Sequence, residues 1–175
     1  MSQSATSTSG SRLARIWRHW RSTQSKGRRA FPPETLDAIA KAIASGEQRH
    51  RSEVRLIVEH GMPFDALWAG MGIRERAIAL FAEYGIWDTE DNCGVLIYVN
   101  LAEHQIEIVT DRNVGRKIDN IVWKRVCATM TQGFALGQFH AATLAALAQV
   151  NSLLVEHFPA QGARANELPD RPIML

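Results

Sequence analysis

The chain has 175 residues, of which 46% are hydrophobic and 22% charged, and its formal net charge is +2 at pH 7. These values are ordinary for a soluble globular chain and predict one domain that can bury a core without disulfides. Two isolated cysteines exclude a disulfide framework, and the absence of 18 consecutive apolar residues excludes a typical transmembrane helix.

The basic residues are unevenly spread. Seven of the 20 lysines and arginines precede residue 30, in a segment without aspartate or glutamate. With those seven removed, 13 basic residues remain against 18 acidic ones, which gives the rest of the chain a net charge of −5. No apolar stretch follows the basic segment, as a secretory signal would require. We therefore expect a cytoplasmic protein, peripheral to the inner face of the membrane, with a basic arm on an acidic domain.

The arm, residues 1–30, is predicted to be disordered apart from one short amphipathic helix. Leu13, Ile16, Trp17 and Trp20 share one helix face, and basic side chains occupy the rest. Such a helix can bind an anionic membrane surface or a protein partner, although it can also be a frayed tail or pack on its own domain. Because the domain is acidic, nucleic acid is not expected. The predicted contact residues are Arg12, Leu13, Arg15, Ile16, Trp17, Arg18, Trp20 and Arg21.

The folded domain is predicted over residues 31–158, beginning with a helix that starts at the proline pair before Glu34. A strand over 53–59 follows. A second helix, with Asp65 as its N-cap, is expected to break near Gly70 and Gly72 and to end at Gly85. Strands over 94–100 and 105–110, joined by a short turn, should form an antiparallel hairpin at the centre of the sheet.

Two more helices complete the prediction. Apolar positions between Ile118 and Met130 indicate one helix, and the alanine-rich stretch from Phe139 to His157 indicates a buried one. The tail, residues 159–175, should be loosely ordered. The order α-β-α-β-β-α-α predicts an α/β fold, a three-layer α/β/α sandwich with a mixed sheet.

Two polar loops are candidate sites. Asp88, Glu90 and Asp91 precede the strand over 94–100, and their carboxylates could bind Ca²⁺ or Mg²⁺. Arg112, Asn113 and Arg116 follow the strand over 105–110, and these residues, with backbone amides there, could bind an anion. A solvated loop and ordinary turn chemistry are the alternative interpretations. Because antiparallel neighbours enter and leave at one edge, a joint site near Asp91 and Asp111 is allowed.

Other chemical motifs are missing. The six histidines show no zinc-binding spacing, and no nucleophile elbow, phosphate-binding loop or dinucleotide-binding fingerprint occurs. We expect Cys93 and Cys127 to be reduced, mostly buried thiols. Trp68, Trp87 and Trp123 are expected in the core or at interfaces. The sequence assigns no catalytic residue.

The hairpin also carries a resemblance. The run from Asp91 to Val99, the alternating strand that ends at Asp111, and the spacing of Met130, Phe134, Gly137 and Phe139 resemble the TPM-domain family. That family is named for a thylakoid-lumen acid phosphatase, a photosystem II repair factor and an auxiliary subunit of a levamisole-gated receptor. The likeness spans residues 54–158. It implies an α/β/α sandwich, and the chain resembles a short, soluble bacterial variant.

The departures from that pattern bear on function. Members usually carry Gly-x-Gly-Leu-Glu after the third strand, whereas this chain has Asp111-Arg112-Asn113-Val114-Gly115, without the glutamate. The missing glutamate leaves fewer carboxylates that could hold a metal ion. We therefore expect a non-catalytic accessory or scaffolding protein, and keep a metal-dependent acid phosphatase as the alternative, with Asp88 and Asp91 on the metal and Arg112 on phosphate.

Overall fold

The computed structural model describes residues 6–162 and 166–175, and its centre is a four-stranded mixed sheet with the strand order β3-β2-β1-β4. β1 runs parallel to both of its neighbours, and β2 and β3 form the antiparallel hairpin. The strands are β1 (Val54–Glu59), β2 (Val95–Asn100), β3 (Gln105–Thr110) and β4 (Ile173–Met174).

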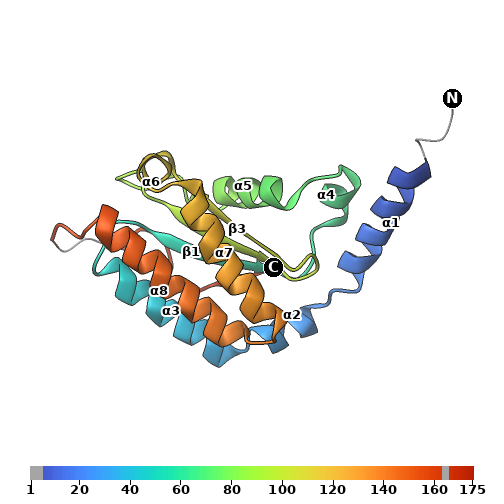
Figure 1. The fold of residues 1–175 in the computed structure, drawn as a ribbon, viewed down its shortest axis with the longest axis horizontal. Coiled ribbons are helices and arrows are strands. Elements are labelled where there is room, and N and C mark those ends of the chain that lie inside the picture. Colours follow the sequence, from blue (N-terminus) through green and yellow to red (C-terminus); the bar gives the residue numbers. More distant parts are fainter. Residues whose placement is uncertain (1–5, 163–165) are drawn as a thin grey trace.

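Helices cover both faces of the sheet, as the sequence predicts (Figure 1). One face carries α3, α7 and α8, and the other carries α4 and α5, with α1 packed against α4 at the periphery. The helices are α1 (Thr6–Trp20), α2 (Gln24–Ala30), α3 (Pro33–Glu47), α4 (Phe64–Trp68), α5 (Ile73–Glu83), α6 (Arg112–Lys117), α7 (Asn120–Ala135) and α8 (Phe139–His157).

The two cores follow from the alternation of side chains along the strands. In β2, Val95, Ile97 and Val99 belong to the core beneath α3, α7 and α8. Leu96 and Tyr98 point to the opposite face and join the core beneath α4 and α5. All six residues of β2 are buried, which is the expected consequence of an apolar strand covered on both faces.

The hairpin position differs in part from the prediction. β2 is an inner strand, but β3 lies at the edge of the sheet, and β1 takes the second inner position. The sequence of the hairpin fixes the antiparallel pair and its turn, with His104 in the left-handed region at φ 54°. It does not determine that the earlier strand, β1, adds alongside β2.

Three local predictions need correction. The second helix does break near Gly70, but α4 begins after Pro63, so Asp65 is inside the first turn and is not the N-cap. The loop after Asp111 contains a short helix, α6. The tail expected to be loose ends in β4, where Ile173 and Met174 pair with Ile57 and Val58.

The arm is also more ordered than expected. Residues 1–5 lie outside the described residues, but residues 6–20 form α1 and residues 24–30 form α2. Phe31, at the end of α2, is buried and makes edge contacts with Phe134 and Phe139. The arm is therefore continuous with the domain from α2 onward. Within the described residues, no helix is long and apolar enough to cross a membrane.

Candidate functional site

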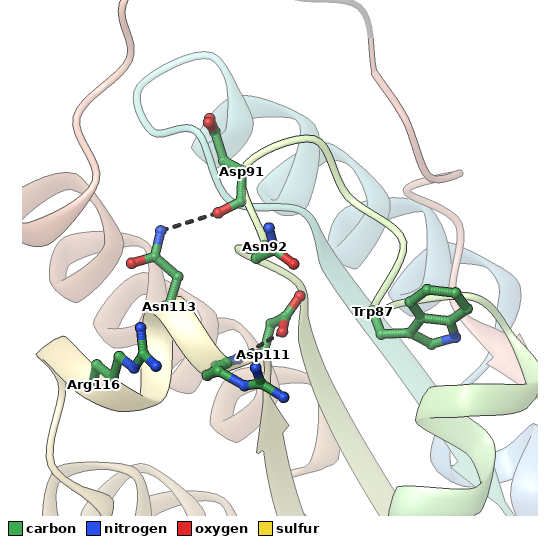
Figure 2. Close-up of a pocket in the computed structure, with 7 residues that line it drawn as sticks. Trp87, Asp91, Asn92, Asp111, Asn113 and Arg116 are labelled. Carbon is green, nitrogen blue, oxygen red and sulfur yellow. Dashed lines mark hydrogen bonds between the residues drawn. The ribbon is translucent and has the colours of Figure 1, made fainter.

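The start of β2 and the end of β3 bring the two polar loops to one edge of the sheet. Val95 pairs with Thr110, and the amide of Asp111 donates to the carbonyl of Gly94 at 2.8 Å. An open cavity of about 510 Å³ lies there, which we call the edge cavity (Figure 2). The cavity lies where the hairpin register allows a joint site. Its lining residues are Trp87, Asp91, Asn92, Asp111, Arg112, Asn113 and Arg116.

The loop before β2 is held by local contacts. The amide of Cys93 donates to the Thr89 hydroxyl at 2.9 Å, and Asn92 turns the chain with a φ of 51°, a conformation that asparagine tolerates better than most residues. At Gly94 the chain passes so close to Ile86 that a Cβ would stand 1.9 Å from the Ile86 carbonyl oxygen. These contacts give the acidic loop one defined path into the sheet.

Asp111, which also lines the edge cavity, stabilises the start of α6. It is the N-cap of α6, and its Oδ1 accepts a hydrogen bond from the amide of Arg112 at 2.6 Å. Its carboxylate therefore occupies the helix end where the sequence suggested an anion could bind. The second oxygen, Oδ2, is buried and has no hydrogen-bond partner among the described residues.

Asn113 connects the two walls of the edge cavity. Its side-chain amide donates to the backbone carbonyl of Asp91 at 3.0 Å and lies 3.6 Å from the sulfur of Cys93. Both partners are in the loop before β2, whereas Asn113 belongs to α6 after β3. The predicted anion ligand is thus a link between the two loops, and its amide nitrogen is engaged in that link.

The charges of the edge cavity are mixed. The Asp91 carboxylate forms an ion pair with Arg51, with an Nη1–Oδ2 distance of 3.4 Å, and it points away from the Asp111 carboxylate in Figure 2. Arg112 and Arg116 are exposed and supply two cations to the same lining. Two carboxylates and two guanidinium groups therefore share the cavity, a pattern that suits an anion better than it suits a bare metal ion.

The predicted metal ligands are only partly brought together. Asp91 lines the edge cavity, but Asp88 and Glu90 are exposed and do not. The Glu90 amide donates a hydrogen bond to Glu167 Oε2 at 3.0 Å. Across residues 6–162 and 166–175, no three histidine, cysteine, aspartate or glutamate side chains are grouped so that they could hold a metal ion.

Trp87 is the lining residue whose role the sequence did not suggest. It was expected in the core or at an interface, like Trp68 and Trp123. Trp123 is buried, but Trp68 and Trp87 are 67% and 53% exposed. Figure 2 places Trp87 across the edge cavity from Asn113 and Arg116. Its position directly before an acidic loop was the only available signal.

The two cysteines are free, as expected, and neither is an activated nucleophile. Burial raises the pKa of the Cys93 thiol, and the nearby Asp91 carboxylate raises it further. Burial also raises the pKa of Cys127 to about 11. Thiolate is the reactive form, so both groups are poor nucleophiles at neutral pH.

The opposite end of β2 carries the second candidate region, the docked helix α1. Arg15 forms an ion pair with Glu103 in the hairpin turn, with an Nε–Oε1 distance of 2.5 Å, and donates to the Met71 carbonyl at 2.9 Å. Ile16 packs against the core beneath α4 and α5. Two of the predicted contact residues, Arg15 and Ile16, thus face the domain.

His19 completes this attachment. The Met62 amide donates to His19 Nδ1 at 2.9 Å, so Nδ1 is an acceptor and the ring proton is on Nε2. Nε2 lies 2.8 Å from Glu103 Oε1, to which it donates. His19 is almost completely buried, and sequence reasoning did not single it out.

The remaining predicted contact residues face solvent. Leu13, Trp17 and Trp20 are 61%, 56% and 74% exposed, and Arg18 and Arg21 are exposed beside them. The two indole rings lie 5.3 Å apart, and the Arg21 guanidinium is 5.9 Å from the Trp17 ring centre. The side chain of Arg12 is outside the described part of the structure.

Comparison with known proteins finds a similar solved structure and a matching family model. The solved NMR structure of the BA42 protein, from the psychrophilic bacterium Bizionia argentinensis, superposes with a TM-score of 0.71. The match covers 81% of this chain and 92% of that chain at 22% sequence identity, so it bears on the fold alone. A search of the curated proteins gave no match. The family model of the TPM domain matches residues 26–153. From this match over most of its length, the chain belongs to the TPM-domain family.

Proposed function

We propose that this protein is a non-catalytic accessory protein that docks on an anionic membrane surface through α1. The observation that carries the proposal is the division of α1 into two faces. Arg15, Ile16 and His19 hold the helix on the domain, while Leu13, Trp17 and Trp20 remain exposed. A helix attached in this way presents its apolar stripe outward.

The physical chemistry of that stripe favours a membrane surface. Burying one large apolar side chain contributes roughly 1.5–3 kcal/mol, and leaving three of them in water forgoes that gain. Tryptophan is suited to the headgroup region because its ring is apolar and its N–H can hydrogen-bond. The headgroup region of a membrane, which offers both apolar and polar groups, therefore solvates this stripe better than water does.

The exposed cations add an electrostatic contribution. Each lysine or arginine close to an anionic leaflet contributes about 1 kcal/mol, and the attraction falls off within a Debye length. The rest of the chain is net acidic and is repelled by the same surface. This combination predicts a defined orientation and binding that weakens at high salt. The exposed cations of the arm are Arg18, Arg21, Lys26, Arg28 and Arg29.

The adjacent helix supports the same assignment. α4 packs against α1 and carries two further exposed aromatic side chains, Phe64 and Trp68, which are 63% and 67% exposed. Their rings are stacked with centres 5.8 Å apart. Two exposed aromatic pairs on neighbouring helices exceed the scattered apolar residues that are normal on a protein surface.

Vesicle co-sedimentation tests the proposal. The full chain is mixed with vesicles of phosphatidylcholine alone, or with added phosphatidylglycerol, at low and high salt. We expect binding to the anionic vesicles only, with loss of most binding in the Trp17→Ala/Trp20→Ala double variant. Trp87→Ala is the matched control, because Trp87 is 53% exposed, close to the 56% of Trp17, but lies at the other end of β2. Equal binding by the wild type and the double variant would contradict the proposal, and binding to a protein instead would reassign the surface.

A metal-dependent acid phosphatase remains the second candidate, because one cavity contains Asp91 and Asp111 together with two arginines. In that case Arg112 and Arg116 would hold the phosphate, and a metal ion would have to be held by Asp91 or Asp111 with water completing its shell. Turnover of p-nitrophenyl phosphate with Ca²⁺, Mg²⁺ or Mn²⁺ tests it. Activity that Asp91→Ala and Arg112→Ala both abolish would support this alternative, and activity unchanged by either would discard the site.

A further inference from the structure

A second cavity lies beside the N-terminal end of β1 and is separate in its lining from the edge cavity, although Arg51 links the two by its ion pair with Asp91. Its volume is about 390 Å³, which is room for a small molecule and not only for a single ion. Three carboxyl groups line it, those of Glu47, Glu53 and Asp170, together with His50. We call it the carboxylate cavity.

The two ring nitrogens of His50, which lines the carboxylate cavity, differ in their hydrogen bonds. The residue is only 2% exposed, and its Nε2 lies 3.2 Å from Asn151 Oδ1. The Asn151 amide nitrogen donates to the Ala42 carbonyl at 3.1 Å, so its oxygen faces His50, and Nε2 must be the donor. Burial lowers the pKa of His50, which favours the neutral ring. The other ring nitrogen, Nδ1, is then an acceptor, and it makes no hydrogen bond of good geometry within the described residues, although the backbone of Ser52 and of His50 itself lies beside the ring.

Glu47 presents a second unfilled acceptor. Its Oε1 accepts from the Val54 amide at 2.9 Å, but its buried Oε2 has no donor within residues 6–162 and 166–175. Burial, with further contributions from Glu53 and Asp170, raises the pKa of Glu47 to about 9. Its neighbour Asp170 is itself a carboxyl group and can satisfy Glu47 only by sharing a proton. The shared proton offsets part of the negative charge that the three carboxyl groups bring together.

Within residues 6–162 and 166–175, no cation hydrogen-bonds the open oxygen of Glu47, although the charge of the buried Arg55 interacts with Asp170 and Glu47. Arg51 lines the cavity, and its Nη1 is directed to Asp91, while its buried Nε is a donor without a partner among the described residues. Arg55 is buried nearby and donates to the Arg171 carbonyl at 3.3 Å. Glu53 accepts hydrogen bonds from the amides of Glu167 and Leu168, at 3.4 and 3.2 Å. Once Glu47 is ionised, its open oxygen and His50 Nδ1 are both acceptors, so a ligand that displaces the Glu47 proton brings hydrogen-bond donors and positive charge to them.

We propose that the carboxylate cavity binds a small organic cation that carries an ammonium or guanidinium group, held by Glu47, Asp170 and Glu53 and hydrogen-bonded to His50. A metal ion fits less well, because the described residues contain no group of three side chains placed to ligate one. An ammonium or guanidinium group has several N–H donors spread over more space, which suits acceptors that do not converge on one point. The site does not depend on the membrane-docking proposal, since it is formed by different residues.

Binding must displace the proton that Glu47 holds at neutral pH, which gives the test a specific signature. The full chain is titrated by calorimetry with butane-1,4-diamine, and separately with the guanidinium compound agmatine, to distinguish the two cation types. Butane-1,4-diol is the neutral control, and CaCl₂ tests the metal alternative. We expect saturable binding of at least one organic cation, tighter at pH 8.5 than at pH 6 by at least about tenfold, with an enthalpy that depends on the ionisation heat of the buffer.

Variants assign the binding to the cavity. Glu47→Gln and Asp170→Asn should each weaken binding by roughly tenfold, the loss expected for one charged hydrogen bond. Asp37→Asn is the matched control, because Asp37 is an exposed carboxylate whose partner, Arg171, is next to Asp170. If Glu47→Gln does not fold, Asp170→Asn decides the result. No saturable binding of either cation at millimolar concentration overturns the proposal, as does binding that Asp170→Asn leaves unchanged or that CaCl₂ alone reproduces.

Discussion

Gly94 and Ile86 approach each other so closely that a methyl group on Gly94 would stand 1.9 Å from the Ile86 carbonyl oxygen. The contact closes the loop that carries Trp87 and Asp91 and fixes where that loop enters β2. The edge cavity therefore depends on a backbone contact that only glycine permits, as well as on its polar side chains.

Replacing Gly94 with alanine should consequently damage both stability and the edge cavity. The backbone carbonyl cannot move without displacing the buried Ile86, so we expect a loss of about 2–4 kcal/mol in the free energy of unfolding. Urea unfolding measures this loss. Gly115→Ala is the control, since a Cβ there would be an ordinary 3.4 Å from the Thr110 hydroxyl. A Gly94→Ala protein as stable as the wild type would show that the loop can shift without cost.

The pH dependence of stability should report Glu47. Its pKa is raised from 4.5 in the unfolded chain to about 9 in the fold, mainly by burial. The folded state therefore binds the proton more tightly, and this contribution to stability is fully present below pH 4.5 and is lost as pH rises towards 9. We expect the urea midpoint to fall over this range, and to fall less in Glu47→Gln. Glu34→Gln, at an exposed position, should follow the wild type. Parallel curves for wild type and Glu47→Gln would contradict the raised pKa.

The attachment of α1 should depend on Glu103. This carboxylate receives hydrogen bonds from both Arg15 and His19, and although burial alone raises its pKa, those two partners lower it overall. Glu103→Gln should release α1 at neutral pH and speed trypsin cleavage at Arg18 and Arg21 several-fold. The pKa of Glu103 is lowered from the usual glutamate value of 4.5. In the wild type, the stabilisation from Glu103 should therefore disappear as the pH falls below 4.5 and through this lowered pKa.

Glu107→Gln is the matched control for that experiment. Glu107 pairs with Arg74, whose side chain is 52% exposed, and exposed pairs contribute about 0–1 kcal/mol. Cleavage of the arm at the same rate in Glu103→Gln and Glu107→Gln would mean that Ile16 packing and the bonds to Met71 and Met62 hold the helix without Glu103.

Tyr98 should contribute to stability through its hydroxyl. The hydroxyl donates to Glu59 Oε2 at 2.5 Å and accepts from the Asn100 side chain at 2.9 Å, and Glu59 is also ion-paired with Arg76. Tyr98→Phe removes the acceptor of the Asn100 side-chain nitrogen and one of the donors to Glu59, which keeps Arg76, and should cost about 1–3 kcal/mol in the free energy of unfolding. Tyr84→Phe, at a partly exposed position, should cost much less. Equal effects of the two substitutions would argue against the network.

Most of the fold was predictable because its periodicities are local. Short stretches of sequence are enough to predict the apolar run of β2, the alternation of β3 and the break between α4 and α5. α6 was missed because six residues are too few for a helical pattern. β4 was missed because two residues between prolines and the chain end have no periodicity, and their strand exists only through pairing with β1.

The candidate site was predictable only in its location. The hairpin register places Asp91 and Asp111 at one edge, and both line the same cavity. The partners of each side chain were not predictable, since Arg51 lies 40 residues from Asp91 and Arg15 lies 88 residues from Glu103. The acceptors of the carboxylate cavity are likewise collected from α3, the strand entry and the tail.

The pairing of β4 with β1 has a consequence for how the protein avoids self-association. β1 is an inner strand only because Ile173 and Met174 lie along one side of it, and the carbonyl of Leu175 is bonded to the His60 amide at 3.0 Å. Without them, an apolar strand would show unpaired backbone groups, the kind of edge on which sheets from different chains join. The last three residues thus cover the part of β1 at Ile57 and Val58 against intermolecular pairing, and they also pack on the two cores.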